Sequence, residues 1–252
     1  MCIFSGPIFS VSQTNIFARE LSGDRQILAY GMSLSAGQDL AMILPLPVPP
    51  GSAESAVEFI DLSGCPDLFD ELQRGFPAPP SFGPPPFGAP LGEQLLAVVQ
   101  VGSFEASFVP RIADFNRLDP RFRLSTEVWS ALPGYASFGF AVFKLRAGEH
   151  KVHPMAFAFP RANPAVLFFP TLHIHDGRVH PTARFDHSLF CQWTDRSARG
   201  VHQPDRDWRI AASQTKFFVD TRRCRSVVHP DAWCFRREIK GDAENADVYI
   251  PV

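Results

Sequence analysis

Three histidines in the segment 171–180 have the spacing of metal ligands. His173 and His175 precede the dipeptide Asp176-Gly177, and His180 follows it. An Asp-Gly dipeptide between alternating apolar residues is typical of a two-residue type I′ turn, so the segment is predicted to be a β-hairpin. In that register His173 faces His180, and all three imidazoles share one face of the hairpin. Opposed Cβ atoms lie about 5 Å apart, so the three imidazoles are predicted to bind one ion at about 2.0–2.1 Å.

This predicted site has the ligand set of a catalytic transition metal. Three neutral imidazoles with an open position suit zinc, and copper or iron can use the same set. His187 or Cys2 is a candidate fourth ligand, and Asp176 or Asp186 is expected to accept an imidazole N–H and fix its tautomer. Arg178 shares the histidine face and would repel a cation unless it binds an anionic substrate, which makes it a candidate catalytic residue. The reaction, oxidative or hydrolytic, is left open.

Cys2 suggests a second chemistry. It follows the initiator methionine, whose removal is expected because the next side chain is small. The exposed α-amine, with an ordinary pKa of about 7.7–8.0, would then act as the base for the adjacent thiol. The sequence therefore also permits an N-terminal-nucleophile cysteine hydrolase, and Cys2 is equally compatible with an ordinary apolar residue of the first strand.

Three hypotheses of function follow from these residues. The first is a metalloenzyme acting on a small molecule or peptide, with copper or zinc, or iron, as its cofactor. The second is the cysteine hydrolase, and the third is a non-catalytic binding protein whose hairpin lies on the surface. A phosphate-cradling glycine loop and a Gly-x-Ser-x-Gly elbow are absent from the sequence, which argues against nucleotide-dependent chemistry and serine hydrolysis.

Composition and charge narrow the cellular context. The formal net charge of -2 offers no broad basic field for nucleic acid. No stretch approaches the roughly 20 apolar residues of a membrane helix, and no signal peptide is recognisable, so a cytoplasmic location is expected. The five cysteines are an odd number and do not resemble a disulfide framework. The oligomeric state is not predicted.

Apolar patterning predicts a β-rich α+β fold, an antiparallel sheet or sandwich with a few short helices and long Pro-rich loops. The 24 Phe and 24 Pro favour strands joined by irregular connections. Strands are predicted over 26–34, 39–45, 95–101, 138–145, 153–159, 165–169 and 246–252, and helices over 66–72, over 111–118 and after Trp208. Residues 1–252 are predicted to form a single domain, with the Pro-rich loop 76–90 inside it.

Three motifs give the chain a resemblance to a known family. Residues 39–47 read Asp-Leu-Ala-Met-Ile-Leu-Pro-Leu-Pro, residues 101–106 read Val-Gly-Ser-Phe-Glu-Ala, and residues 139–144 read Gly-Phe-Ala-Val-Phe-Lys. Over roughly residues 25–170 this order resembles a family of uncharacterised bacterial proteins with the pattern DxAMVVPVPV, VGxYDA and FVAxKV. The resemblance implies a β-rich fold and no particular activity, and the histidine segment is not part of it. Members of that family are usually exported.

Overall fold

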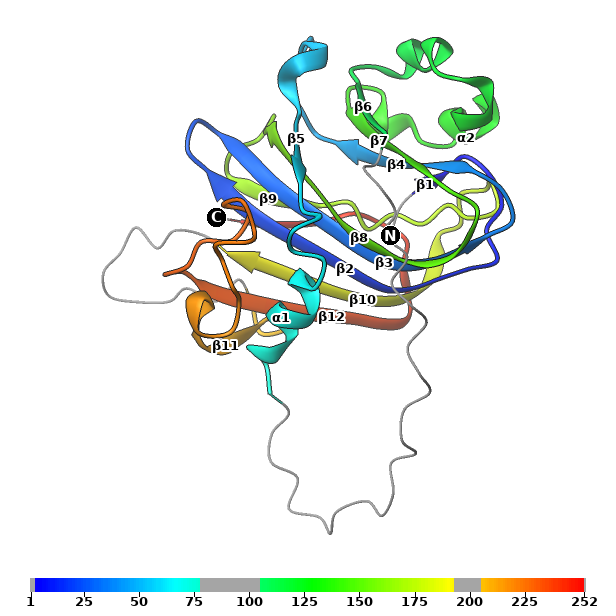
Figure 1. Cartoon of the computed structure of the whole chain (residues 1–252). Coiled ribbons are helices and arrows are strands. Elements are labelled where there is room, and N and C mark those ends of the chain that lie inside the picture. Colours follow the sequence, from blue (N-terminus) through cyan, green and yellow to red (C-terminus); the bar gives the residue numbers. More distant parts are fainter. Residues whose placement is uncertain (1–2, 78–104, 193–204, 252) are drawn as a thin grey trace, which may run out of the picture.

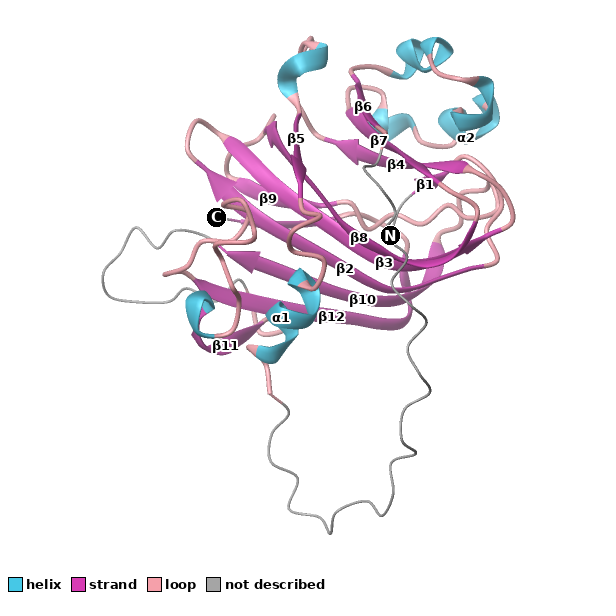
Figure 2. Ribbon diagram, in the orientation of Figure 1, coloured by secondary structure: helices cyan, strands magenta, loops and turns pink. Residues whose placement is uncertain are grey.

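The computed structural model describes residues 3–77, 105–192 and 205–251. Two β-sheets pack face to face, and a short two-stranded sheet lies beside them (Figures 1 and 2). The strands are β1 Ile3–Phe4, β2 Ser10–Leu21, β3 Arg25–Ala36, β4 Leu40–Leu46, β5 Glu58–Asp61, β6 Ala106–Val109, β7 Gly139–Leu145, β8 Gly148–Pro160, β9 Val166–Phe169, β10 Thr182–Gln192, β11 Arg209–Gln214, β12 Trp233–Glu244 and β13 Val248–Pro251. The expectation of a β-rich fold of sandwich type is confirmed.

The large sheet has seven strands in the order β11-β12-β10-β2-β3-β8-β5. Its β2–β3 hairpin turns at Gly23 and Asp24, whose φ angles of 71° and 56° suit the right-handed twist of the paired strands. β10 pairs with β2 in parallel, with His187 opposite Thr14, and the other described pairs are antiparallel. β3 is buried along most of its length, because alternate residues pack into the clusters on the two faces of the sheet.

The small sheet has four strands in the order β1-β4-β7-β6. Every residue of β4 is buried, because one face of this strand meets the large sheet and the other meets an outer layer of short helices. β9 and β13 form the third sheet and close one side of the core. The side-chain amide of Gln26 in β3 donates to the Phe168 carbonyl at 2.7 Å and accepts from its N–H at 3.0 Å, which fastens β9 to the large sheet.

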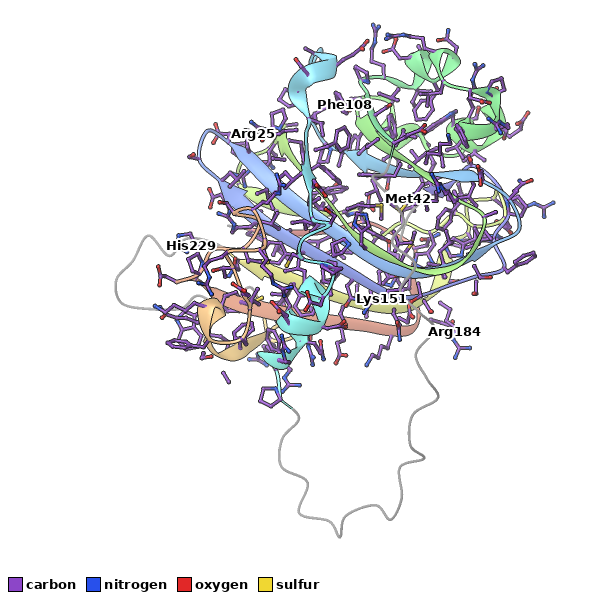
Figure 3. The ribbon with its side chains drawn as sticks, viewed as in Figure 1. Arg25, Met42, Phe108, Lys151, Arg184 and His229 are labelled. Carbon is purple, nitrogen blue, oxygen red and sulfur yellow. The ribbon has the colours of Figure 1, made fainter. Side chains whose placement is uncertain are left out.

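The main core fills the space between the two large layers. Phe143 of the small sheet contacts Phe59 and Phe157 of the large sheet, with ring centroids 5.5 and 5.8 Å apart. Met42, labelled in Figure 3, is buried in this cluster from β4. Aromatic rings at these separations pack edge to face or tilted, which adds to the free energy gained from burying their area.

Each sheet also has an outer layer. On the far face of the large sheet, helix α1 (Leu68–Arg74) and the segment 215–228 lie side by side (Figure 1) and share an apolar cluster with Phe190 of β10. On the far face of the small sheet lie α2 (Thr126–Ser130) and the 3-10 helices Ile112–Arg117, Pro120–Phe122 and Pro133–Tyr135. Two further 3-10 helices span Glu54–Ala56 and Thr215–Phe217.

Several predicted elements need correction. The chain after Trp208 forms the strand β11 and not a helix, because Arg209 and Ile210 pair with the edge of β12. The predicted helix over 111–118 is a 3-10 helix. The predicted strand 95–101 and all but the first two residues of the loop 76–90 lie outside the described residues. None of the helices in the described ranges is long and apolar enough to cross a membrane.

Candidate functional site

The segment 171–180 is an irregular loop between β9 and β10, so the hairpin prediction is wrong. Gly177 has a positive φ of 73°, but Asp176 does not, and a type I′ turn needs both. The Asp176 carboxylate instead accepts the Arg178 backbone N–H at 3.0 Å. Ile174 forms a parallel bridge with Ile3 at the edge of the small sheet. The loop therefore adds to β1 and does not pair with itself.

Asn245, just beyond β12, organises the backbone of this loop. Its Oδ1 accepts the His173 N–H at 2.7 Å, and its Nδ2 donates to the carbonyls of His173 and His180, both at 2.9 Å. The amide therefore stands between the two segments that the predicted hairpin would have paired directly. Nearby, the Asp247 carboxylate accepts the N–H groups of Thr171 and Leu172 at 2.8 and 2.9 Å.

Side chains before the bend alternate as predicted. Leu172 and Ile174 are buried against the outer face of the small sheet, with Val179 packed beside them. His173 and His175 point the other way, and their rings stack with centroids 5.1 Å apart and an angle of 24° between planes. The predicted pairing of these two histidines on one face is therefore confirmed, although the strand geometry that predicted it is not.

His187 of β10 completes the group in place of His180. Its ring lies 5.1 Å from that of His173 at an angle of 31°, and Phe185 packs against both imidazoles. His173, His175 and His187 are called the histidine cluster from here on. The His180 side chain is 54% exposed and its Nε2 lies 2.9 Å from an Asp176 carboxylate oxygen, away from the cluster.

The prediction of a metal-binding site, with copper or zinc as its ion, is wrong. Within 3–77, 105–192 and 205–251 no group of three or more His, Cys, Asp or Glu side chains is placed to hold a metal ion. The predicted ligand His180 does not join His173 and His175, because the loop does not fold into the hairpin that would have paired them. His180 and Asp176, two of the predicted site residues, face each other at the surface instead.

Burial determines the protonation of the histidine cluster. Desolvation lowers the pKa of His173 to about 2 and that of His175 to about 4, and it lowers the pKa of His187 as well. All three rings are therefore neutral at physiological pH. At that pH the neutral imidazoles pack against one another and against Phe185.

A surface hollow of about 360 Å³ borders the histidine cluster. Its lining combines apolar and charged groups: Ile8, Phe9, Ser10, Val11, His175, Arg184, Phe185 and Asp186. Phe9 is 80% exposed, and Arg184 points away from the protein at the end of β10 (Figure 3). A second hollow, of about 390 Å³, lies beside α1 and includes the Lys151–Asp70 ion pair, whose atoms are 2.6 Å apart.

The remaining predicted residues do not join the cluster. Arg178 is exposed on the bend, and Cys2 lies outside the described residues, so the cysteine hydrolase hypothesis stays a prediction. Asn245 and Phe185 had no local signal in the sequence, because their importance depends on contacts with distant segments.

Comparisons with known proteins identify the fold. No family model matches the chain, and no curated protein matches it. The crystal structure of baculovirus P35 aligns over 100% of this chain and 99% of its own, with a TM-score of 0.51 and 11% sequence identity. The crystal structure of the caspase-8/P35 complex aligns over 96% of both chains, with a TM-score of 0.44 and 11% identity. The described residues therefore have the β-sandwich fold of P35, and P35 itself is found in complex with a protein partner.

Proposed function

We propose that this chain is a non-catalytic binding protein whose target is a cysteine protease of the caspase class. The observation that carries the proposal is the correspondence with P35 over the full length of both chains. A mutated P35 has been crystallised after caspase cleavage, and P35 has been crystallised in complex with caspase-8. A fold supports many functions, so the target must be tested directly.

The hollow beside Phe9 is the surface we propose for contact with the protease. Phe9 is 80% exposed, and apolar side chains of Ile8 and Val11 line the same hollow. Aromatic side chains that become buried on binding supply much of the energy of protein interfaces. Arg184 and Asp186 on the rim provide charges of both signs, as expected at the polar edge of an interface.

The test uses the full chain and active caspase-8. Purified protein is titrated against the protease, residual cleavage of a fluorogenic peptide is measured, and complex formation is followed by size-exclusion chromatography. We expect a stable complex and loss of protease activity near equimolar ratio. Papain serves as a cysteine protease of a different class. Full activity of caspase-8 at a tenfold excess of this chain, with no co-elution, would overturn the proposal.

Two matched variants test the contact surface. Phe9→Ala is expected to weaken the complex about tenfold or more, because it removes a central apolar contact. Phe217, 70% exposed on the 3-10 helix Thr215–Phe217, is the control position. Phe217→Ala is expected to bind as the unmodified chain does. Equal affinity of all three proteins would place the interface elsewhere while leaving the target intact.

A further inference from the structure

Two cysteine thiols meet on the far face of the large sheet. Cys65 precedes α1 and Cys224 lies in the turn after the 3-10 helix Thr215–Phe217, 159 residues away, yet their Sγ atoms are 2.6 Å apart. Both are free cysteines with fully buried side chains. A disulfide has an S–S length of about 2.05 Å, so the two sulfurs need to approach by only about half an ångström to bond. Cys65 and Cys224 are called the thiol pair below.

An ionic network already fastens the two segments that carry the thiol pair. Arg223 contacts the carboxylates of Asp67 at 3.0 Å and Glu71 at 2.7 Å, both from the segment that includes α1. Glu71 in turn accepts the backbone N–H of Asp220 at 2.9 Å. These contacts hold the two segments against each other, so the two sulfurs remain within reach of one another.

The environment distinguishes the two sulfurs. The hydrogen bond between the thiols lowers the pKa of Cys65, and the positive charge of Arg223 lowers it further. The same hydrogen bond, together with burial, raises the pKa of Cys224. Cys65 is therefore the sulfur that ionises first, and the thiolate is the nucleophilic form of cysteine. Burial raises the pKa of Cys191 and Cys234, which makes both of them less reactive.

The cysteines of the thiol pair are buried, but their neighbours along the chain reach the surface. The neighbours of Cys65 along the chain, Gly64 and Pro66, are exposed, and so are Arg223 and Arg225 on either side of Cys224. Arg225 and Ser226 have positive φ angles of 44° and 61°, so the turn that covers Cys224 is a tight one.

We propose that the thiol pair is an oxidation site, at which a hydroperoxide converts Cys65 and Cys224 into an intramolecular disulfide. The Cys65 thiolate attacks one peroxide oxygen, the O–O bond breaks, and the departing alkoxide takes up the thiol proton as an alcohol. The Cys224 sulfur then attacks the resulting sulfenic acid, forming the S–S bond and releasing water with the second thiol proton. Two thiols are oxidised, and the peroxide is reduced by two electrons. The bond would clamp α1 to the turn 221–226.

Alkylation of the full chain tests the proposal. Reduced and hydrogen peroxide-treated samples are denatured and treated with N-ethylmaleimide, and the intact mass of the chain is then measured by mass spectrometry. The five cysteines give five adducts in the reduced sample, and three are expected after oxidation. A tryptic digest without reductant should contain peptide 26–74 joined to dipeptide 224–225. Oxidation should also raise the melting temperature, by on the order of 5 °C.

Two serine variants complete the test. Cys65→Ser should give four adducts in both samples and no rise in melting temperature. Cys191→Ser, a buried cysteine outside the pair, should still lose two adducts on oxidation. An equal number of adducts in reduced and oxidised unmodified chain, or a linked peptide joining other cysteines, would overturn the proposal. The peptide map of the unmodified chain decides the matter even if a variant does not fold.

Discussion

The histidine cluster and the thiol pair lie on opposite faces of the large sheet. Both consist of buried polar side chains, but the two groups are arranged differently. His187 shares its face of β10 with Leu189 and Cys191, which belong to the core between the sheets. Cys65 and Cys224 belong to the cluster on the other face. The rings of His173 and His175 stack at 24° and that of His187 is tilted by 31° against His173, whereas the two sulfurs of the thiol pair lie 2.6 Å apart. Desolvation lowers the pKa of His173 and His175 and keeps them neutral, whereas the neighbouring thiol and Arg223 lower the pKa of Cys65 and favour its ionised form. The surroundings of a buried group, and not its type alone, therefore determine whether it can react.

Acid should affect the histidine cluster strongly. In the folded chain burial lowers the pKa of His173 to about 2 and that of His175 to about 4, below the unfolded value of about 6.5. As the pH falls below 6.5, these histidines take up protons in the unfolded chain but not in the folded chain. Their contribution to the free energy of unfolding is therefore fully present above pH 6.5 and is lost towards lower pH. Between pH 6.5 and 5.5 the free energy of unfolding should drop by about 1 kcal/mol per histidine, or about 3 kcal/mol for the cluster.

Urea denaturation at a series of pH values measures this loss. The ordinary pKa values of carboxylates lie well below the window from 6.5 to 5.5, so histidines dominate the change. His173→Gln should reduce the loss by about a third. The same pH dependence in this variant and in the unmodified chain would contradict neutral burial of the cluster.

On the other face, Glu71→Gln should weaken the network around the thiol pair. Glu71 is buried, and its carboxylate contacts Arg223 at 2.7 Å and Arg74 at 3.2 Å. Glutamine keeps an oxygen for the Asp220 N–H but removes the charge. We expect a loss of about 1–2 kcal/mol in the free energy of unfolding under reducing conditions.

The matched control for this variant is Asp70→Asn in the same helix. Asp70 pairs with Lys151, which is labelled in Figure 3, at 2.6 Å, and both side chains are about half exposed or more. Exposed ion pairs of this kind typically contribute about 0.2–1 kcal/mol. Urea denaturation of both variants in dithiothreitol makes the comparison. If the two substitutions cost the same, the buried network does not hold the two segments together, and the thiol pair must be positioned by apolar packing alone.

The fold could be predicted where a local pattern determines the structure. The apolar run at 39–45 predicted a strand, and the corresponding β4 is buried along its whole length. The prediction of a helix after Trp208 failed because β11 is formed by pairing with β12, more than twenty positions further along the chain. Secondary structure that depends on a distant partner leaves little trace in its own sequence.

The candidate site could be predicted only in part, for the same reason. His173 and His175 share a face because neighbours two residues apart do so in any extended chain. Asn245 binds the backbone of His173 from 72 residues away and that of His180 from 65 residues away, and no local pattern indicates these contacts. The contact between Cys65 and Cys224 spans 159 residues, and no spacing rule could have joined those two cysteines.

The smallest expected effect concerns His180, the histidine that the sequence grouped with the cluster and the structure separates from it. His180→Ala removes a contact with Asp176 in which both side chains are more than half exposed, so the free energy of unfolding should change by no more than about 0.5 kcal/mol. The hydrogen bond with His180 is the main cause of the lowered pKa of Asp176. In the variant the Asp176 carboxyl, followed by NMR titration, should therefore return towards its ordinary value. A loss of stability above about 1.5 kcal/mol would show that His180 packs with the buried histidines after all. An Asp176 pKa that does not move would show that the contact with His180 is not what lowers it.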